Sequence, residues 1–371
     1  MVNHLGNWRN GELGNFITLK RGFDLPQQKR EDGQVPIFSS SGITGTHSTA
    51  MVNAPGVITG RYGTIGEVFY AAEDFWPLNT TLFVEDFHGN DAEFIYYFLK
   101  TLEWSKFTSA SAVPGINRNT VHKETVSLPD IETQRRIAST LSMLDEKIKT
   151  NTEINDNLYA QAKAIFDNHF INIDAIPAGW RKGNLLDIAN YLNGLAMQKF
   201  RPQGNEIGLP VLKIKELRQG SCDDSSELCS LRIKPEYIIH DGDVIFSWSG
   251  SLLVDIWCGG TCGLNQHLFK VTSDIYDKWF YYLWTAHHLA RFIAIAADKA
   301  TTMGHIKREE LAKAEVLIPC EEDYTSLTSI MQPIFELIIS NRIEARKLAA
   351  LRDELLPKLM SGEIDVSAIQ L

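Results

Sequence analysis

The sequence IASTLSMLDEKIKTNTEINDNLYAQAKAI at residues 137–165 decides the expected architecture of this chain. Apolar or small residues recur there at alternating spacings of four and three, and asparagines stand at two of the positions. The sequence LTSIMQPIFELIISNRIEARKLAALRDEL at residues 327–355 repeats the pattern, each position lying 190 residues after its counterpart. This heptad pattern predicts two long helices that pair along their length. A helix of about 35–40 residues spans about 55–60 Å, which is too long for one small domain and indicates a coiled-coil arm.

The sequence alone allows the two helices to pair parallel or antiparallel. In an antiparallel pair within a duplicated chain, equivalent residues face each other only at the midpoint. Asn151 and Asn341 are equivalent and lie near the middle of their helices, so we predict that they meet. A polar residue in an apolar seam costs stability but fixes the register of the pair. The alternative is that both asparagines point outward.

Two prolines fall inside the second helical stretch. Pro333 is expected to kink the helix or to split off its first turns, because proline removes a helical hydrogen bond. Pro357 is expected to bend or end the helix, and Gly362 suits a C-terminal stop.

The remaining sequence is also written twice. Six motifs recur in the same order: residues 6–11 and 178–183, 35–38 and 209–212, 57–58 and 244–245, 78–83 and 264–269, 94–99 and 279–284, and 126–129 and 316–319. Gly22 and Gly194 follow the first motif at the same distance in both copies. Six matches in register indicate a duplicated domain, because the period is too long for a solenoid.

Each globular copy mixes short β-type runs with turns. Residues 56–59 and 81–84 predict strands, and residues 94–102 predict a short helix. The tyrosine pairs at 96–97 and 281–282 are interpreted as packing residues of that helix rather than as DNA-stacking residues.

Composition narrows the class of protein. The chain has 371 residues, 44% hydrophobic and 22% charged, which predicts two or three globular domains rather than a disordered chain. No apolar run is long enough for a transmembrane helix, and the first residues lack the apolar core of a signal peptide, so we expect a cytoplasmic protein. A formal net charge of −10 excludes a uniformly basic surface for nucleic acid but not a local basic face.

Five cysteines all lie in the second half, and their odd number argues against a disulfide framework. Cys258 and Cys262 with His267 suggest zinc, but no second tight pair completes four ligands, so we favour ordinary thiols and expect no metal. The chain lacks a phosphate-binding nucleotide loop, an amino-methyltransferase motif and an H-E-x-x-H motif. It is therefore not expected to be an enzyme, although a catalytic site assembled in space stays open.

An order of globular domain, long helix, globular domain, long helix resembles the specificity subunit of type I restriction–modification systems. The motifs behind this resemblance are Trp8-Arg9 and Trp180-Arg181, VITGRYGTIG at 57–66, LPDIETQRRIA at 128–138 and LLPKLMSGEI at 355–364. The family usually has Glu-Gln where this chain has Thr133-Gln134, and the second copy departs further at residues 319–324.

The resemblance implies an α+β fold with two similar α/β target recognition domains and two long helices in an antiparallel coiled coil related by a pseudo-two-fold axis. The expected divisions are 1–130 and 176–320 for the domains, 131–175 for the first helix, and 321–371 for the second helix and tail. Each domain would read one half of a split double-stranded DNA site, and the helices would set the spacer. At 3.4 Å per base pair, the arm would span about 16–18 base pairs.

The resemblance also implies partners. Two modification subunits would bind S-adenosylmethionine and methylate adenine, and restriction subunits would complete the nuclease. No cofactor is expected on this chain itself, with S-adenosylmethionine, ATP and Mg on the partner subunits, and no membrane is involved.

Candidate DNA contacts are chosen by chemistry, since lysine and arginine favour phosphate or guanine and aromatic residues can stack on bases. In the first domain they are Lys20, Arg21, Lys29, Arg30, Arg61, Tyr62 and Arg118. In the second they are Lys199, Arg201, Lys213, Lys215, Arg218, Trp248 and Lys307. A solvated side chain or surface ion pair is the alternative for each cation, and core packing is the alternative for Trp248.

Three other functions stay open at this point. The first is a specificity subunit of a type IIB-like fused modification–nuclease system. The second is a coiled-coil adaptor that binds no DNA, which would explain the helices but not the duplicated turn-rich domains. The third is an enzyme with a spatially assembled site.

Overall fold

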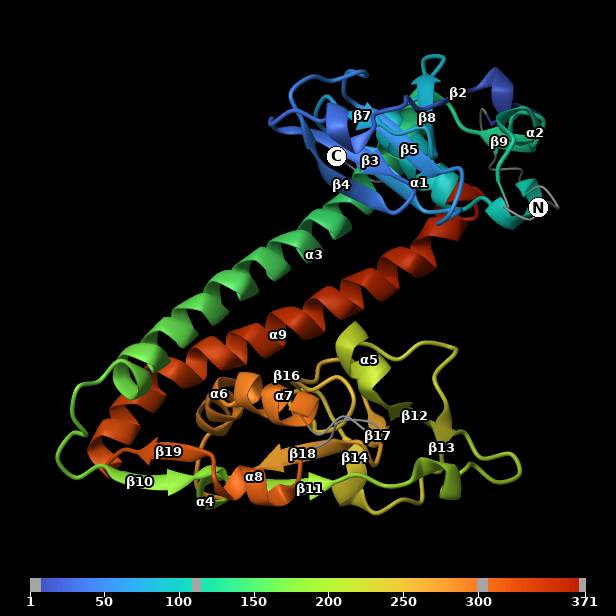
Figure 1. Cartoon of the computed structure of the whole chain (residues 1–371). Coiled ribbons are helices and arrows are strands. Elements are labelled where there is room, and N and C mark those ends of the chain that lie inside the picture. Colours follow the sequence, from blue (N-terminus) through green and yellow to red (C-terminus); the bar gives the residue numbers. More distant parts are fainter. Residues whose placement is uncertain (1–7, 109–114, 299–305, 367–371) are drawn as a thin grey trace. The chain divides into compact units, whose positions relative to one another are not determined.

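The computed structural model describes residues 8–108, 115–298 and 306–366 of the chain (Figure 1). The chain divides into two compact units, Met1–Glu146 with Ala349–Leu371, and Lys147–Leu348. The division falls within the two long helices, because each helix joins the core of a different unit at each of its ends. Residues 6 and 7 of the first repeated motif lie outside the described residues.

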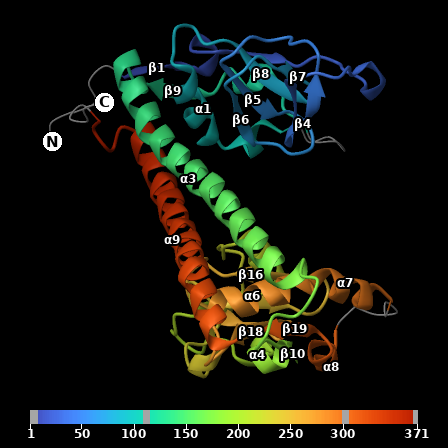
Figure 2. The same cartoon turned by 90° about the vertical axis from the view of Figure 1, so that its left-hand side faces the viewer.

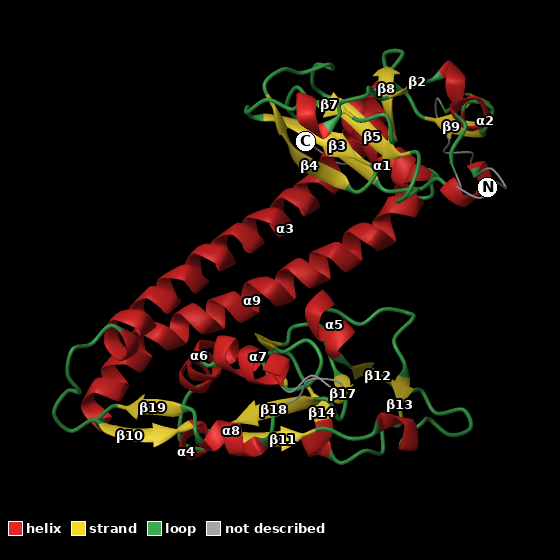
Figure 3. Cartoon of the chain, in the orientation of Figure 1, coloured by secondary structure: helices red, strands yellow, loops and turns green. Residues whose placement is uncertain are grey.

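The described residues of the first unit form three small sheets and two short α-helices (Figure 3). Its four-stranded antiparallel sheet has the order β2 (Thr18–Arg21), β8 (Thr81–Asp86), β5 (Gly56–Gly60) and β6 (Val68–Ala71). Beside it are the sheet β4 (Gly42–His47), β3 (Val35–Ser39) and β7 (Trp76–Pro77), and the pair β1 (Arg9–Glu12) and β9 (Thr125–Leu128). Its helices are α1 (Ala92–Lys100) and α2 (Arg118–Val121), with 3-10 turns at Leu13–Asn15, Gln27–Lys29 and Trp104–Phe107.

The second unit repeats this plan. One four-stranded sheet has the order β11 (Asn190–Asn193), β18 (Leu268–Thr272), β15 (Val244–Ser247) and β16 (Leu253–Ile256). A second has the order β13 (Leu228–Cys229), β12 (Leu209–Leu212), β17 (Cys262–Leu264) and β14 (Ile238–Ile239). The third sheet is the pair β10 (Arg181–Asn184) and β19 (Glu315–Ile318). Its short helices are α4 (Leu185–Ile188), α5 (Ile214–Gln219), α6 (Lys278–His287), α7 (Leu289–Asp298) and α8 (Arg308–Ala312), with 3-10 turns at Met197–Lys199 and Pro235–Tyr237. The sheet β2-β8-β5-β6 of the first unit and the sheet β11-β18-β15-β16 of the second have equivalent strand orders, which confirms the predicted duplication.

Hydrogen bonds correct one of the sequence correspondences by one residue. Leu78 N donates to Phe38 O at 2.8 Å in the first unit, and Asn265 N donates to Leu212 O at 3.2 Å in the second. Leu78 therefore corresponds to Asn265, whereas the sequence motif aligns it with Leu264. Both alignments superpose short apolar runs, so the pattern alone cannot detect a slip of one residue.

Close backbone contacts explain why Gly22 and Gly194 recur at the same place. A Cβ at Gly22 would lie 2.2 Å from the carbonyl oxygen of Leu78, and one at Gly194 would lie 2.2 Å from that of Asn265. No side chain fits at that distance from backbone. Both glycines thus allow the chain to pass directly over the turn that precedes β8 or β18.

The predicted short helix is α1, and its tyrosines pack as expected. Tyr97 is buried and donates to Asp145 Oδ2 at 2.6 Å, while Tyr281 and Tyr282 of α6 are both 7% exposed. Burial, and next the hydrogen bond to Asp145, raise the pKa of Tyr97. These contacts support the packing interpretation for both pairs.

The first turn of each long helix is bonded to its own domain in the same way. Gln134 Oε1 accepts the backbone N–H of Asp91 at 2.9 Å, and Tyr324 Oη accepts that of Asp277 at 2.6 Å. Gln134 and Tyr324 are equivalent, 190 residues apart, and Asp91 and Asp277 are the N-cap residues of α1 and α6. The sequence of the second copy differs at this position, but a different side chain accepts the equivalent hydrogen bond.

The long helices are α3 (Ile131–Phe166), continued by a π-helical turn over Asp167–Ile171, and α9 (Glu321–Met360), green and red in Figure 2. Helix α9 is continuous through Pro333 and Pro357, so the expected split and the expected end at these prolines are wrong. Met331, Phe335 and Leu359 are buried on either side of the prolines, and this packing offsets the missing hydrogen bonds. Gly362, with φ +75°, follows the helix as the predicted stop.

Within the second unit, α3 and α9 run antiparallel. The contacts step backward along α9 as they step forward along α3: Lys147 Nζ to Glu344 Oε2 at 3.4 Å, Asn151 Nδ2 to Asn341 O at 3.5 Å, and Asn155 Nδ2 to Ile338 O at 3.2 Å. In the first unit, Arg352 of α9 pairs with Asp145 of α3. The expected α+β class with an antiparallel helix pair is confirmed.

Asparagines occupy the middle of this pair, as the sequence analysis expected. Asn151 lies within side-chain reach of Asn341, but its side chain meets the backbone there and also donates to Glu344 at 2.7 Å. The side chain of Asn341 donates instead to Asn155 Oδ1 at 3.0 Å. All three asparagines are buried, with exposed fractions of 9% or less, so they do not point outward.

Each core contains residues from both long helices. Ile137 and Leu141 of α3 join Leu359 and Met360 of α9 in the core of the first unit. Ala162 and Phe166 of α3 join Leu327 and Met331 of α9 in the core of the second. No helix in the described part of the chain is both long and apolar enough to cross a membrane.

Replacing Asn341 with leucine should destabilise the helix pair by about 1–3 kcal/mol, because Asn155 Oδ1 would stay buried without a donor. The double variant N155L/N341L should recover most of this loss, since both polar partners would be gone. Thermal unfolding of the purified chain measures both effects. The exposed Asn157, replaced with leucine, is the matched control on α3. A double variant that loses the sum of the single losses would contradict the role of this bond.

Candidate nucleic-acid interface

Five of the candidates in the first domain line one hollow with a volume of about 620 Å³. Its polar side chains come from three segments, which are the end of β2, the residues after β5, and the residues that lead into and begin α2; Leu82 of β8 completes the lining. The candidates that line it are Lys20, Arg21, Arg61, Tyr62 and Arg118. Residues that are far apart in sequence thus come together here, which the choice of candidates by chemistry did not predict.

Backbone bonds determine the shape of this hollow. Arg61 N donates to Thr80 O at 2.9 Å, and Ile116 N donates to Arg61 O at 3.0 Å, so the segment before α2 crosses the end of β5. A Cβ at Gly115 would lie 2.2 Å from Tyr62 Cε1, so only glycine lets the tyrosine ring lie against this segment. The Arg61 guanidinium stacks over the Tyr62 ring at 4.5 Å from its centre.

The hollow is cationic. No Asp or Glu lines it, and no ion pair of Arg61 or Arg118 is found within the described ranges. Lys20 pairs with Glu85, and Arg21 lies 3.5 Å from Asp24, but exposed pairs of this kind are weak and exchange readily. The surface can therefore donate to phosphate oxygens or to guanine.

Lys29 and Arg30 do not join this hollow. Lys29 is exposed at the end of a 3-10 turn, and Arg30 is half-buried with its Nε unpartnered within the described structure. Lys29 and Arg30 lie at the end of this turn, where no heptad or strand alternation in the sequence indicates which way a side chain points.

In the second unit, Trp248 and Lys307 occupy the place that corresponds to this hollow. Ile306 N donates to Trp248 O at 3.1 Å, which matches the bond from Ile116 to Arg61 in the first unit. Trp248 Nε1 donates to Asn193 Oδ1 at 3.0 Å, and its ring packs 5.8 Å from the centre of Phe269. The ring is only partly buried and packs against the main core of the second unit, which supports the packing interpretation of Trp248.

Three other candidates of the second domain line a separate hollow of about 450 Å³: Arg201, Lys213 and Lys215. Arg201 and Lys213 both pair with Glu227, and Lys215 lies 3.5 Å from Asp223. Lys199 and Arg218 are exposed on nearby segments but do not line it.

The sequence analysis missed several polar residues of these hollows. Asn117 and Asn119 line the first, and Glu227, Gln266 and His267 line the second. Asn117 Oδ1 caps α2 by accepting from Asn119 N at 3.0 Å. A choice restricted to cations and aromatic residues passes over such side chains, although asparagine and glutamine also bond to base edges.

The cysteine pair considered for zinc is split between two clusters. Cys258 packs in the main core of the second unit and Cys262 in a smaller cluster with Cys222. Burial raises the pKa of the Cys258 thiol to about 11, which suits a packed thiol. Among the residues that the structure describes, no group of three or more His, Cys, Asp or Glu side chains could hold a metal ion.

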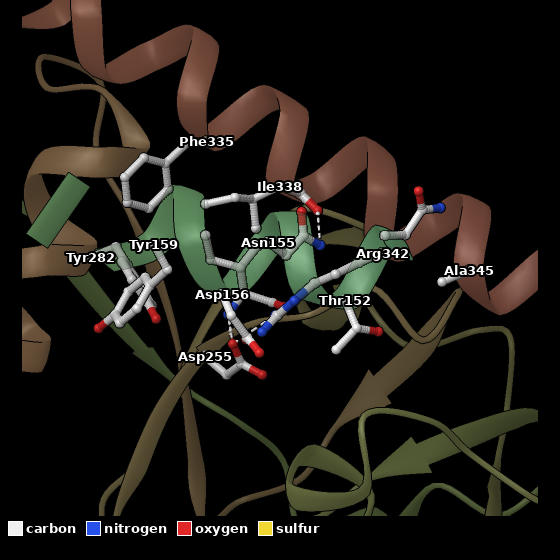
Figure 4. A pocket seen from close by; sticks show the side chains of 12 residues that line it. Thr152, Asn155, Asp156, Tyr159, Asp255, Tyr282, Phe335, Ile338, Arg342 and Ala345 are labelled. Atoms are coloured by element: carbon white, nitrogen blue, oxygen red, sulfur yellow. Dashed lines mark hydrogen bonds and ion pairs between the residues drawn. The ribbon is translucent and has the colours of Figure 1, made fainter. Parts of the chain in front are cut away.

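A further hollow of about 360 Å³ lies in the second unit where α3 and α9 meet β16 and α6 (Figure 4). None of the candidate DNA contacts lines it. Arg342 crosses it and donates to Asp255 Oδ1 at 2.8 Å and to Ile256 O at 2.9 Å. Together with the pair between Arg346 and Asp241, this contact fastens α9 to the second domain.

Comparison with known proteins gives consistent matches. A family model described as the type I restriction modification DNA specificity domain matches residues 6–160 and 177–351. The chain is 26% identical over 310 residues to the type I restriction enzyme MjaIX specificity subunit of Methanocaldococcus jannaschii, with 76% of this chain and 71% of that protein covered. It is 20% identical over 354 residues to the type I restriction enzyme HindI specificity subunit of Haemophilus influenzae, with 73% and 77% covered.

A solved structure shares the fold. The S subunit of a type I restriction–modification system from M. genitalium aligns with a TM-score of 0.65 at 15% identity, covering 97% of both chains. Each segment that the family model matches contains one globular domain and most of the long helix after it. The chain therefore belongs to the family of type I restriction–modification DNA specificity proteins.

Proposed function

We propose that each globular domain reads one half of a bipartite, asymmetric DNA site, and that the paired helices set the spacer. The cationic hollow of the first unit is the observation that supports this most directly. Its polar side chains come from three separate segments and face one opening without an acidic neighbour in the lining. Such a surface positions a phosphate backbone, and its arginines and asparagines can bond to base edges.

Differences between the corresponding places support an asymmetric site. Arg61 corresponds to Trp248, since both accept the equivalent bond from the segment that follows. A guanidinium can donate two parallel hydrogen bonds to guanine, whereas an indole ring cannot, so the two places offer different contacts to a base. The two half-sites should therefore differ in sequence.

Catalysis belongs to partner subunits in this proposal. Two modification subunits would bind S-adenosylmethionine and methylate adenine, and restriction subunits would use ATP and Mg. The helix pair offers a docking surface, because Ile330 and Leu337 of α9 are 50% and 46% exposed at a heptad spacing. Apolar side chains at this spacing suit the packing of another helix.

Co-expression with the adjacent modification gene tests the function directly. Mapping of N6-methyladenine in the host DNA should show one motif made of two different half-sites and a fixed spacer. Absence of methylation, with the complex assembled and loaded with S-adenosylmethionine, would reject the proposal. An adjacent gene that fuses modification and nuclease would instead indicate the type IIB-like arrangement.

Replacement of Arg61 or Arg118 with alanine should weaken binding of the assembled complex to its DNA about tenfold and lower the salt slope by about one. Both residues line the cationic hollow, and no ion pair in the described structure occupies them. Titration at several salt concentrations measures both quantities. Lys149→Ala, on the exposed face of α3, is the control and should change neither. Wild-type affinity and slope in both arginine variants would remove this hollow from the interface.

Replacement of Leu337 with glutamate should weaken association with the modification subunit at least tenfold, because a charge would enter an apolar contact. Analytical size exclusion of the co-expressed subunits and a titration by light scattering measure the effect. Glu336→Gln, at the next position of α9, is the matched control. If L337E assembles normally, the docking surface lies on other faces of the helices.

A further inference from the structure

The hollow at β12 and α5 contains an acidic side chain, unlike the cationic hollow of the first unit. Its lining includes a carboxylate, that of Glu227, beside the cations Arg201, Lys213 and Lys215. An acidic side chain weakens the attraction of a surface for phosphate, so this hollow suits phosphate less well than the hollow of the first unit.

Several contacts surround Glu227 in this hollow. Its Oε2 pairs with Arg201 Nη2 and its Oε1 pairs with Lys213 Nζ. Its backbone oxygen accepts from Val211 N at 2.7 Å, which ties the residue to β12. The side chain therefore has two cationic partners and a backbone fixed by a neighbouring strand.

The carboxylate of Glu227 is ionised and partly exposed to solvent. The hydrogen bonds from Lys213 and then from Arg201 lower the pKa of Glu227. Its side chain is 41% exposed, so lone pairs that the two cations leave free face solvent. An ionised carboxylate can only accept hydrogen bonds.

In the major groove, cytosine offers its N4 amino group and adenine its N6 amino group, whereas guanine and thymine present acceptors at the corresponding edge. A fixed carboxylate thus accepts from cytosine or adenine and repels guanine and thymine. The neighbouring cations keep it oriented and can bond to the adjacent phosphates.

We propose that Glu227 is a specificity-determining residue of the second half-site, where it selects cytosine or adenine at one position. The inference rests on the proposed function, because it requires that the second domain contact DNA bases. Arg201 and Lys213 act as positioning residues, which hold the carboxylate toward the base.

The test is Glu227→Gln in the complex co-expressed with the modification subunit, with N6-methyladenine mapped across the host genome. Glutamine keeps the size and adds a donor, so it can also bond to the acceptors of guanine or thymine. The expected result is relaxed selection, about tenfold or more, at one position of the second half-site, with the first half-site unchanged. Glu236→Gln, an exposed acid of the same unit outside the hollow, should leave the motif unchanged.

An unchanged motif in E227Q would overturn the inference while leaving the proposed function intact. Absence of methylation with the wild-type chain would instead reject the proposed function. If E227Q abolishes methylation, the purified complex is titrated with duplexes substituted singly along the second half-site. Preference lost at one position supports the inference, and an equal loss for all duplexes overturns it.

Discussion

The burial of both ends of each long helix in different cores is the constraint on which the rest of the structure depends. Leu359 and Met360 follow the second domain in sequence, yet they pack beside Ile137 in the core of the first unit. The first core is therefore incomplete until the last helix has formed. Contacts over such a long stretch of chain carry a closure entropy, and the apolar area buried at both helix ends offsets it.

The duplication preserves contacts more strictly than it preserves residues. Gln134 and Tyr324 accept the same backbone N–H with an amide and a hydroxyl, respectively. Gly22 and Gly194 are identical, because a close carbonyl oxygen excludes every side chain there. Where only a hydrogen-bond acceptor is needed, several residues serve. Where space is missing, glycine alone does.

The helix pair and the repeat could be predicted from sequence because both are periodic. The heptad predicted the helices, and the antiparallel arrangement brought Asn151 to Asn341. The choice by chemistry named the residues around Arg61 but did not predict that they lie together. The split expected at Pro333 does not occur, since burial of Met331 and Phe335 outweighs one lost hydrogen bond. The one-residue shift in the alignment of Leu78 and the position of Glu227 could not be predicted from the sequence. Both depend on which strands pair and on the paths of the loops between them.

The hollow around Arg61 also bears on how the chain would encounter DNA. The whole chain has a formal net charge of −10, while no acid lines this hollow. A body that is negative overall but positive at one opening repels a polyanion in most orientations and attracts it in one. Collisions of the chain with DNA would then be productive mainly in one orientation, before any base is contacted. The association rate would then depend on salt concentration through this uneven distribution of charge.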